Sequence, residues 1–253
     1  MKQTYLTLTS LLAASALGLS SASAVIVYSE TFDNTGTGNI SLDNATGWKA
    51  AWGASGTAFD NTSNSTAASN PVISDAASSE GTTDGYLFSQ FFDSVTNNPN
   101  IFYVDGLNLG SPVGGEVLDT VSFALRNEDI ATDFHIVLEF GAGNWFLGDS
   151  TFNNTTTNVW TTDLTLDLST ETWKALTVDV GTEISVGAIA SLPSLNTSSL
   201  TGIGFYADIP DQQRIRIDTL EVNAVAAVPE PSTYAALAGA LALGFVMLRR
   251  RRS

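Results

Sequence analysis

Short apolar or alternating segments run through most of this chain, and each ends at Gly, Asn, Asp or Ser. The segments are rich in Val, Ile, Thr, Phe and Trp, which favour strands because their side chains pack well on a pleated surface. Apolar residues at the spacing of an amphipathic helix do not occur before residue 234. The sequence therefore predicts an all-β fold for the part of the chain before that residue.

Two of the expected strands show a strict alternation. Apolar side chains fall at every second position in 121–125 and in 134–140, which is typical of antiparallel strands with one face buried between two sheets. We therefore expect a two-sheet antiparallel jelly-roll sandwich. The expected strands cover residues 25–32, 86–92, 100–104, 119–127, 134–140, 144–147, 160–168, 172–180, 202–207 and 213–222.

Two stretches have weaker strand signals. Residues 34–80 are dense in Gly, Asn, Ser, Thr and Ala, so we expect a long, weakly structured excursion pinned by its few large aromatic residues. Residues 224–227 consist of Ala and Val only and are expected to form a short linker after a β-sandwich domain at 25–223.

The N-terminus has the pattern of a secretory signal peptide over residues 1–24. A lysine near the start precedes an apolar run, and the small residues Ala22 and Ala24 precede the expected cleavage point. Cleavage there would start the mature chain at Val25. The chain contains no cysteine, which excludes disulfides, thiolate metal sites and a cysteine nucleophile.

The exported region is strongly acidic. Residues 25–227 contain five basic and 25 acidic side chains, a net charge of −20. Such a surface repels phosphate backbones and anionic membranes, so we expect no nucleic-acid partner. No Asp-rich calcium loop or other metal-ligand spacing is present, and the sequence predicts neither a metal site nor a cofactor.

The C-terminal segment 228–253 combines three independent features. A Pro-Glu-Pro motif is followed by an uncharged stretch, 234–248, and then by an arginine cluster. As a helix the uncharged stretch is about 22 Å long, short of the ~30 Å hydrocarbon core, but snorkelling arginines let it cross. The arginines are expected to stay cytoplasmic, so the preceding domain lies across the membrane. The motif and cluster residues are Pro229, Glu230, Pro231, Arg249, Arg250, Arg251 and Arg252.

This order and spacing resembles the PEP-CTERM sorting signal of Gram-negative bacteria. The resemblance implies that exosortase, a membrane-embedded cysteine peptidase, is the processing partner and acts at Pro229-Glu230-Pro231. It also implies anchoring in the inner membrane before processing, followed by release to the cell surface, outer envelope or extracellular matrix. An ordinary single-pass anchor is the alternative, and it too places the domain outside the cytoplasm.

The region 25–223 also resembles the concanavalin A-like, laminin-G-type jelly roll. The similar segments are Tyr28–Asn34, Gly47-Trp48, Val121–Arg126, Gly143–Phe146 and Arg214–Asp218. That fold is found in lectins, glucanases and plain adhesive modules, so the resemblance implies a sandwich and constrains function only loosely.

Residues that could carry catalysis are few. His135 is the only histidine and shares a strand face with Glu139, where we expect a hydrogen-bonded surface pair. The Glu-x-Asp-x-x-Glu pattern of β-jelly-roll glucanases, the Gly-x-Ser-x-Gly elbow of serine hydrolases and any phosphate loop are absent. We therefore expect no catalytic residues and no enzyme activity.

Carbohydrate binding is a more plausible specific activity. Sugars stack on exposed aromatic rings and need neighbouring polar groups for their hydroxyls. Trp52, Trp48, Trp145 and Tyr206 are the candidate platform residues, although large aromatics in a sandwich commonly fill the core. We expect Trp52, in the weakly structured stretch, to be the most exposed of them.

These observations predict an exported, membrane-inserted precursor of a surface or matrix protein with a non-catalytic structural or adhesive role. A lectin-like module that binds polysaccharide is the alternative. A glycoside hydrolase or polysaccharide lyase is the second alternative.

Overall fold

The computed structural model describes residues 24–34, 38–42, 47–52, 57–58, 72–79, 81, 84–90, 98–109, 116–127, 133–154, 156–209, 214–226 and 239. Residues 24–225 form a compact unit. Residues 1–23 of the predicted signal peptide, the Pro-Glu-Pro motif and the arginine cluster lie outside the described residues, whereas Ala24, the last residue of the predicted signal peptide, begins the first strand. Among those that are described, no helix has the length and apolar character to span a membrane.

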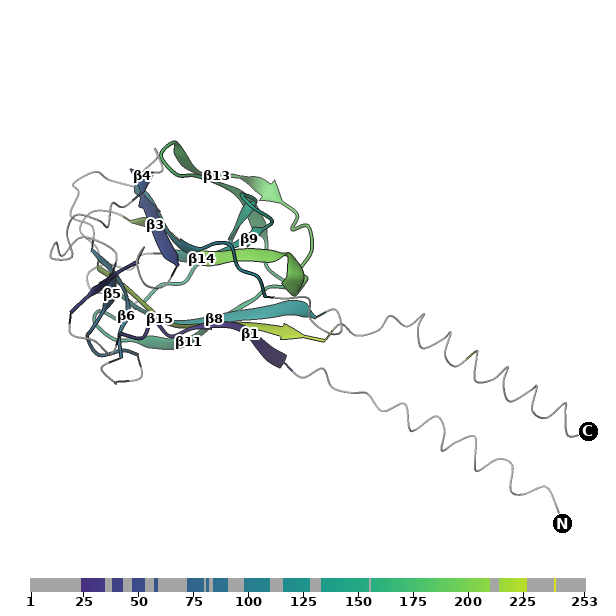
Figure 1. Cartoon of the computed structure of the whole chain (residues 1–253). Helices are drawn as coiled ribbons and strands as arrows, with labels where there is room; N and C mark the ends of the chain where they lie inside the picture. The colour runs from purple at the N-terminus through teal and green to yellow at the C-terminus, as the bar shows by residue number, and fades with distance from the viewer. Residues whose placement is uncertain are drawn as a thin grey trace, which may run out of the picture. The chain divides into compact units, whose positions relative to one another are not determined.

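The unit consists of two antiparallel sheets packed face to face (Figure 1), which confirms the predicted all-β sandwich. The first sheet has seven strands in the order β11-β8-β15-β6-β5-β2, and β1 pairs with the end of β15. Its strands are β1 Ala24–Glu30, β2 Ile40–Ser41, β5 Val72–Ser74, β6 Tyr86–Gln90, β8 Val117–Asn127, β11 Thr161–Asp167 and β15 Arg214–Val225.

The second sheet has eight strands in the order β13-β12-β10-β9-β14-β7-β3-β4. Its strands are β3 Trp48–Trp52, β4 Thr57–Ala58, β7 Asn98–Val104, β9 Phe134–Phe140, β10 Trp145–Gly148, β12 Trp173–Asp179, β13 Glu183–Ala190 and β14 Leu200–Ile209. A 3₁₀ turn, Thr197–Ser199, leads into β14.

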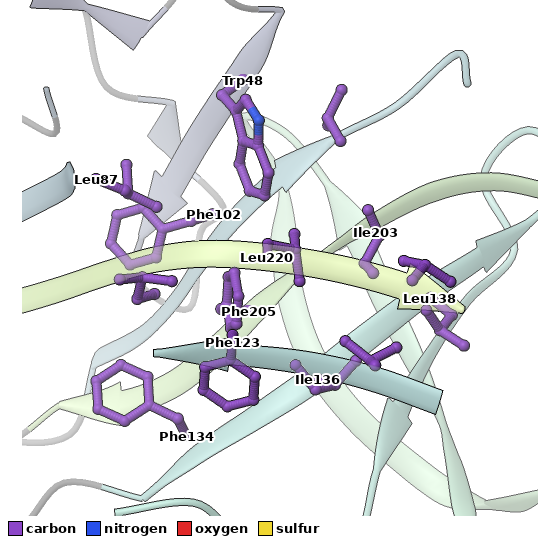
Figure 2. Packing of buried hydrophobic residues seen from close by; sticks show 14 of the residues in the cluster. Trp48, Leu87, Phe102, Phe123, Phe134, Ile136, Leu138, Ile203, Phe205 and Leu220 are labelled. Carbon is purple, nitrogen blue, oxygen red and sulfur yellow. The ribbon is translucent and has the colours of Figure 1, made fainter. Parts of the chain in front are cut away.

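The main core lies between the two sheets (Figure 2). Alternate residues of β8 and β9 point into it, because successive side chains of a strand face opposite sides of the sheet. Phe123 of β8 packs edge-to-face on Phe205 of β14, with ring centroids 5.1 Å apart. Each large apolar side chain removed from water contributes about 1.5–3 kcal/mol, so this layer is the main source of stability.

The stretch 34–80 is more regular than its composition predicts. It contributes β2, β3, β4 and β5, so the expectation of a weakly structured excursion is wrong for these segments. Lys49-Ala50-Ala51 has little intrinsic strand preference, but the whole of β3 pairs with β7. Strand β15 also runs through Val225, so the first two residues of the predicted linker belong to the sheet.

Candidate functional site

The outer face of the eight-stranded sheet carries a second apolar cluster, here called the outer aromatic cluster. Its members are Ala51, Ile101, Tyr103, Val137, Trp145, Leu147, Leu176, Ile184 and Tyr206. They face away from the main core because their neighbours along each strand, such as Ile136 and Leu138 beside Val137, belong to that core.

The structure therefore brings together two of the predicted sugar-platform residues, Trp145 and Tyr206. Both are buried, with 5% and 8% of their surface exposed. Trp145 packs edge-to-face on Tyr103, with centroids 5.2 Å apart, and Tyr206 packs on His135 at 6.1 Å. Rings that contact protein on this scale have no free face for a pyranose, so their prediction as an exposed platform is wrong.

Trp48 has a different position. Its indole is fully buried in the main core, 5.0 Å from the ring of Phe32. Its Nε1–H donates to Glu30 Oε2 at 3.2 Å, which satisfies the one polar atom of the ring. Trp48 is therefore a core residue and not a sugar contact. The side chain of Trp52 lies outside the described residues.

Glu139 and His135 do not form the expected pair. Glu139 is buried, and its carboxylate accepts from the Gly143 amide at 2.7 Å and the Thr201 hydroxyl at 3.0 Å. His135 instead places Nδ1 2.8 Å from the carbonyl oxygen of Gly148. Glu139 thus holds the β9–β10 turn to β14, and both side chains serve the fold.

The outer face of the seven-stranded sheet carries a polar pocket of about 400 Å³, here called the two-bulge pocket. Its described lining residues are Ser79, Ser122, Phe123, Thr162, Asp163, Thr219 and Glu221. They come from β8, from the strands on either side of it, and from the segment after β5.

Two bulges shape this pocket. The register of β11 on β8 shifts between Thr161 and Leu164, and that of β15 on β8 shifts between Asp218 and Glu221. Asp163 and Thr219, within these shifts, have left-handed backbone with φ of 59° and 48°. Such residues are rare when they are not glycine, and bulges of this kind redirect side chains and interrupt the regular sheet surface.

Asp218 supports two walls of the pocket. Its side chain is 1% exposed, and its carboxylate accepts from the Ser79 amide at 2.7 Å and the Thr219 amide at 2.8 Å. Burial raises the pKa of Asp218, and the nearby Asp84 raises it further, while the hydrogen bonds oppose this shift. Sequence reasoning missed the pocket because its residues lie far apart in the chain and form no motif.

Comparisons with known proteins identify the C-terminal segment. Residues 227–252 match the family model of the PEP-CTERM protein-sorting motif. The match includes Pro229, Glu230 and Pro231 and the arginine cluster. No curated protein is significantly similar to the chain.

Solved structures with a similar arrangement of strands have low sequence identity. The family 11 carbohydrate-binding module of Lic26A-Cel5E from Clostridium thermocellum is 10% identical with a TM-score of 0.42, covering 81% of this chain and 98% of its own. The K1 cleaved adhesin domain of Lys-gingipain from Porphyromonas gingivalis W83 is 15% identical with a TM-score of 0.34, covering 79% and 97%. TM-scores this low assign no function to the chain, and the fold assignment rests on the strand pairing described above.

Proposed function

We propose that this chain, which ends in a PEP-CTERM protein-sorting motif, is a non-catalytic structural or adhesive protein of the cell surface or extracellular matrix. The motif marks an exported protein that is sorted through the membrane and processed by exosortase. Residues 1–24 act as the signal peptide, the sandwich is the delivered domain, and 228–253 form the sorting tail with its membrane helix at 234–248.

The observation that carries the non-catalytic role is the use of Glu139 and His135 within the fold. Hydrolysis at the outer face of the eight-stranded sheet would need the His135 or Glu139 side chain to reach a substrate. Both oxygens of the Glu139 carboxylate accept hydrogen bonds from protein groups, and the His135 ring packs edge-to-face with the Tyr206 ring. The only histidine and this buried glutamate therefore stabilise the eight-stranded sheet.

The surface chemistry supports an extracellular role. The exported region carries a net charge of −20, and a charge of that size keeps a protein soluble and repels like-charged molecules. Its described ion pairs, Lys49 with Asp105 and Lys174 with Asp149, are at the surface. A domain with this charge remains dispersed in a hydrated matrix. Its hydrophobic core stabilises the fold without disulfides.

Sorting is tested by expressing the full chain in a host with exosortase and in an otherwise identical host without it. Fractionation and intact-mass measurement should show a form truncated near Pro229-Glu230-Pro231 in the cell-surface fraction of the first host. A Glu230→Ala variant should retain residues 228–253 and stay in the membrane, whereas Glu183→Ala, the same change at an exposed residue of β13, should be processed normally. An intact tail on the surface form in the exosortase host would contradict the proposal.

The non-catalytic role is tested separately by reducing-sugar release and by lyase absorbance with a panel of polysaccharides. We expect no turnover. Turnover of any of these polysaccharides by the wild-type protein, with the folded state confirmed by circular dichroism, would overturn this part of the proposal and favour a hydrolase or lyase.

A further inference from the structure

We propose that the two-bulge pocket binds a neutral saccharide unit, so that the adhesive role acts through the outer face of the seven-stranded sheet. This inference rests on the proposed function above, and it replaces the predicted aromatic platform with a site formed by hydroxyl and carboxylate groups.

The size of the pocket fits a small organic ligand. Its volume of about 400 Å³ lies near the lower end of the range of ligand pockets, ~300–1,000 Å³. A bare cation does not need this space, and calcium takes about 6–8 oxygen ligands. In the described ranges, no group of three or more His, Cys, Asp or Glu side chains could hold a metal ion. The volume and the lining therefore favour a sugar over an ion.

The lining supplies the donors and acceptors that sugar hydroxyls require. Ser122 and Thr219 each offer a hydroxyl that can donate and accept, and the carboxylates of Asp163 and Glu221 accept only. A sugar hydroxyl that donates to a carboxylate makes a charge-assisted hydrogen bond, which is about twice as strong as a neutral one. The described lining therefore complements several hydroxyls at once.

The charge of the lining selects among sugars. Two carboxylates and no basic side chain are found among the described lining residues. Like charges in a partly enclosed site repel, so uronic acids and sulfated or phosphorylated sugars are disfavoured. The ring of Phe123 belongs to the main core and is 2% exposed, so it provides no stacking face. Binding therefore depends on hydrogen bonds and is specific for neutral sugar units.

The backbone holds these groups in place before a ligand arrives. Glu221 lies opposite Ser122 in the register of β15 with β8, and both point outward because their neighbours Val121 and Val222 are fully buried. Across β8, the bulge in β11 presents Asp163, whose carboxylate accepts from the Thr162 hydroxyl at 3.1 Å. Asp218 fixes the Ser79 and Thr219 walls through their amides. Because these side chains are already ordered in the free protein, less binding free energy is lost in ordering them when a ligand binds.

The test uses the full chain in a detergent without a sugar headgroup, because a maltoside would compete for the site. Saturation-transfer NMR and titration calorimetry are run with methyl glycosides of glucose, galactose, mannose and xylose. Methyl glucuronide and CaCl₂ serve as the anionic and cationic probes. The variants are Asp163→Asn, Glu221→Gln and Ser122→Met, which fills the pocket. Asp179→Asn, the same charge change at an exposed residue of β12 on the other sheet, is the control.

We expect at least one neutral glycoside to bind, with affinity falling by about tenfold or more in each pocket variant, as expected for loss of a hydrogen bond to a charged group. The control should bind like the wild type. Asparagine tolerates the left-handed backbone at 163, so that variant should remain folded, which circular dichroism checks. Binding of CaCl₂ alone, binding of glucuronide in preference, no binding at all, or binding unchanged in the variants would each overturn the proposal. None of these results would alter the processing test, so the two proposals fail independently.

Discussion

Trp145 packs against Gly202: a Cβ at position 202 would lie 2.9 Å from Cη2 of the Trp145 ring and 2.8 Å from the carbonyl oxygen of Val104. The glycine in β14 therefore makes room for the indole on the outer face of the eight-stranded sheet. The same added Cβ would lie 2.9 Å from the Glu139 carboxylate. This close packing indicates that the outer aromatic cluster stabilises the sheet and does not form an open binding surface.

Gly202→Ala should destabilise the protein, because backbone and a large ring must both shift to accept one methyl group. We expect the free energy of unfolding to fall by about 1–3 kcal/mol, the usual cost of overpacking, measured by urea denaturation. Gly148→Ala is the matched control, since its nearest neighbour, a Glu171 carboxylate oxygen, would be 3.4 Å away. Equal effects in the two variants would contradict the close packing described here.

Trp145→Ala should be more destabilising, because it opens a cavity within the outer aromatic cluster. The expected loss is about 3–5 kcal/mol, and Trp145→Phe should lose less because it keeps part of the contact with Tyr103. Chemical denaturation measures the loss. An unchanged stability together with a loss of glycan binding would return Trp145 to the role of an exposed sugar platform.

Asp218→Asn should destabilise the two-bulge pocket. The carboxylate accepts from two backbone amides, whereas the amide of asparagine has only one acceptor oxygen and would direct its NH₂ group at the second donor. We expect a loss of about 1–3 kcal/mol, the cost of an unsatisfied buried donor. Hydrogen exchange at the amides of Ser79 and Thr219 should accelerate. Unchanged protection at both amides would contradict this arrangement.

The raised pKa of Asp218 also predicts how stability depends on pH. Because burial raises the pKa of Asp218 above the ordinary value of an aspartate, the folded state holds this proton more tightly than the unfolded state does. Stability from this group is therefore greatest below the unfolded pKa and is lost as pH rises toward the folded pKa. The difference in unfolding free energy between wild type and Asp218→Asn should decrease with rising pH across that window. A difference that stays constant with pH would contradict the assignment.

Much of the architecture could be predicted from residue patterns. The alternation in β8 and β9 identified the core faces. Strand β13 was not predicted. Most of its side chains are exposed, so its sequence lacks the alternation of apolar and polar residues that marks a half-buried strand. For the sugar-platform residues, the sequence could identify large aromatics but could not show that the outer face of the sheet is covered. Trp145 packs on Tyr103 of β7, and Tyr206 packs on His135 of β9. Both contacts join strands that are far apart in the sequence.

The two-bulge pocket shows a further limit of sequence reasoning. Asp163 and Thr219 occur in segments whose composition is ordinary for strands, and neither is a glycine that would mark a left-handed residue. The bulges become visible only when register is known, because they arise from the mismatch of β11 and β15 with β8.

Thr219→Asn should stabilise the protein. Threonine is β-branched and rarely adopts left-handed backbone, while asparagine does so with less strain. With φ at 48°, the native residue is strained, and we expect the substitution to increase the unfolding free energy by about 0.5–1 kcal/mol. Thermal and urea denaturation measure this change. Asp163→Asn is the control, because aspartate and asparagine both tolerate this conformation, and it should change stability little. A loss of stability in Thr219→Asn would show that contacts of the threonine side chain outweigh the strain of its backbone.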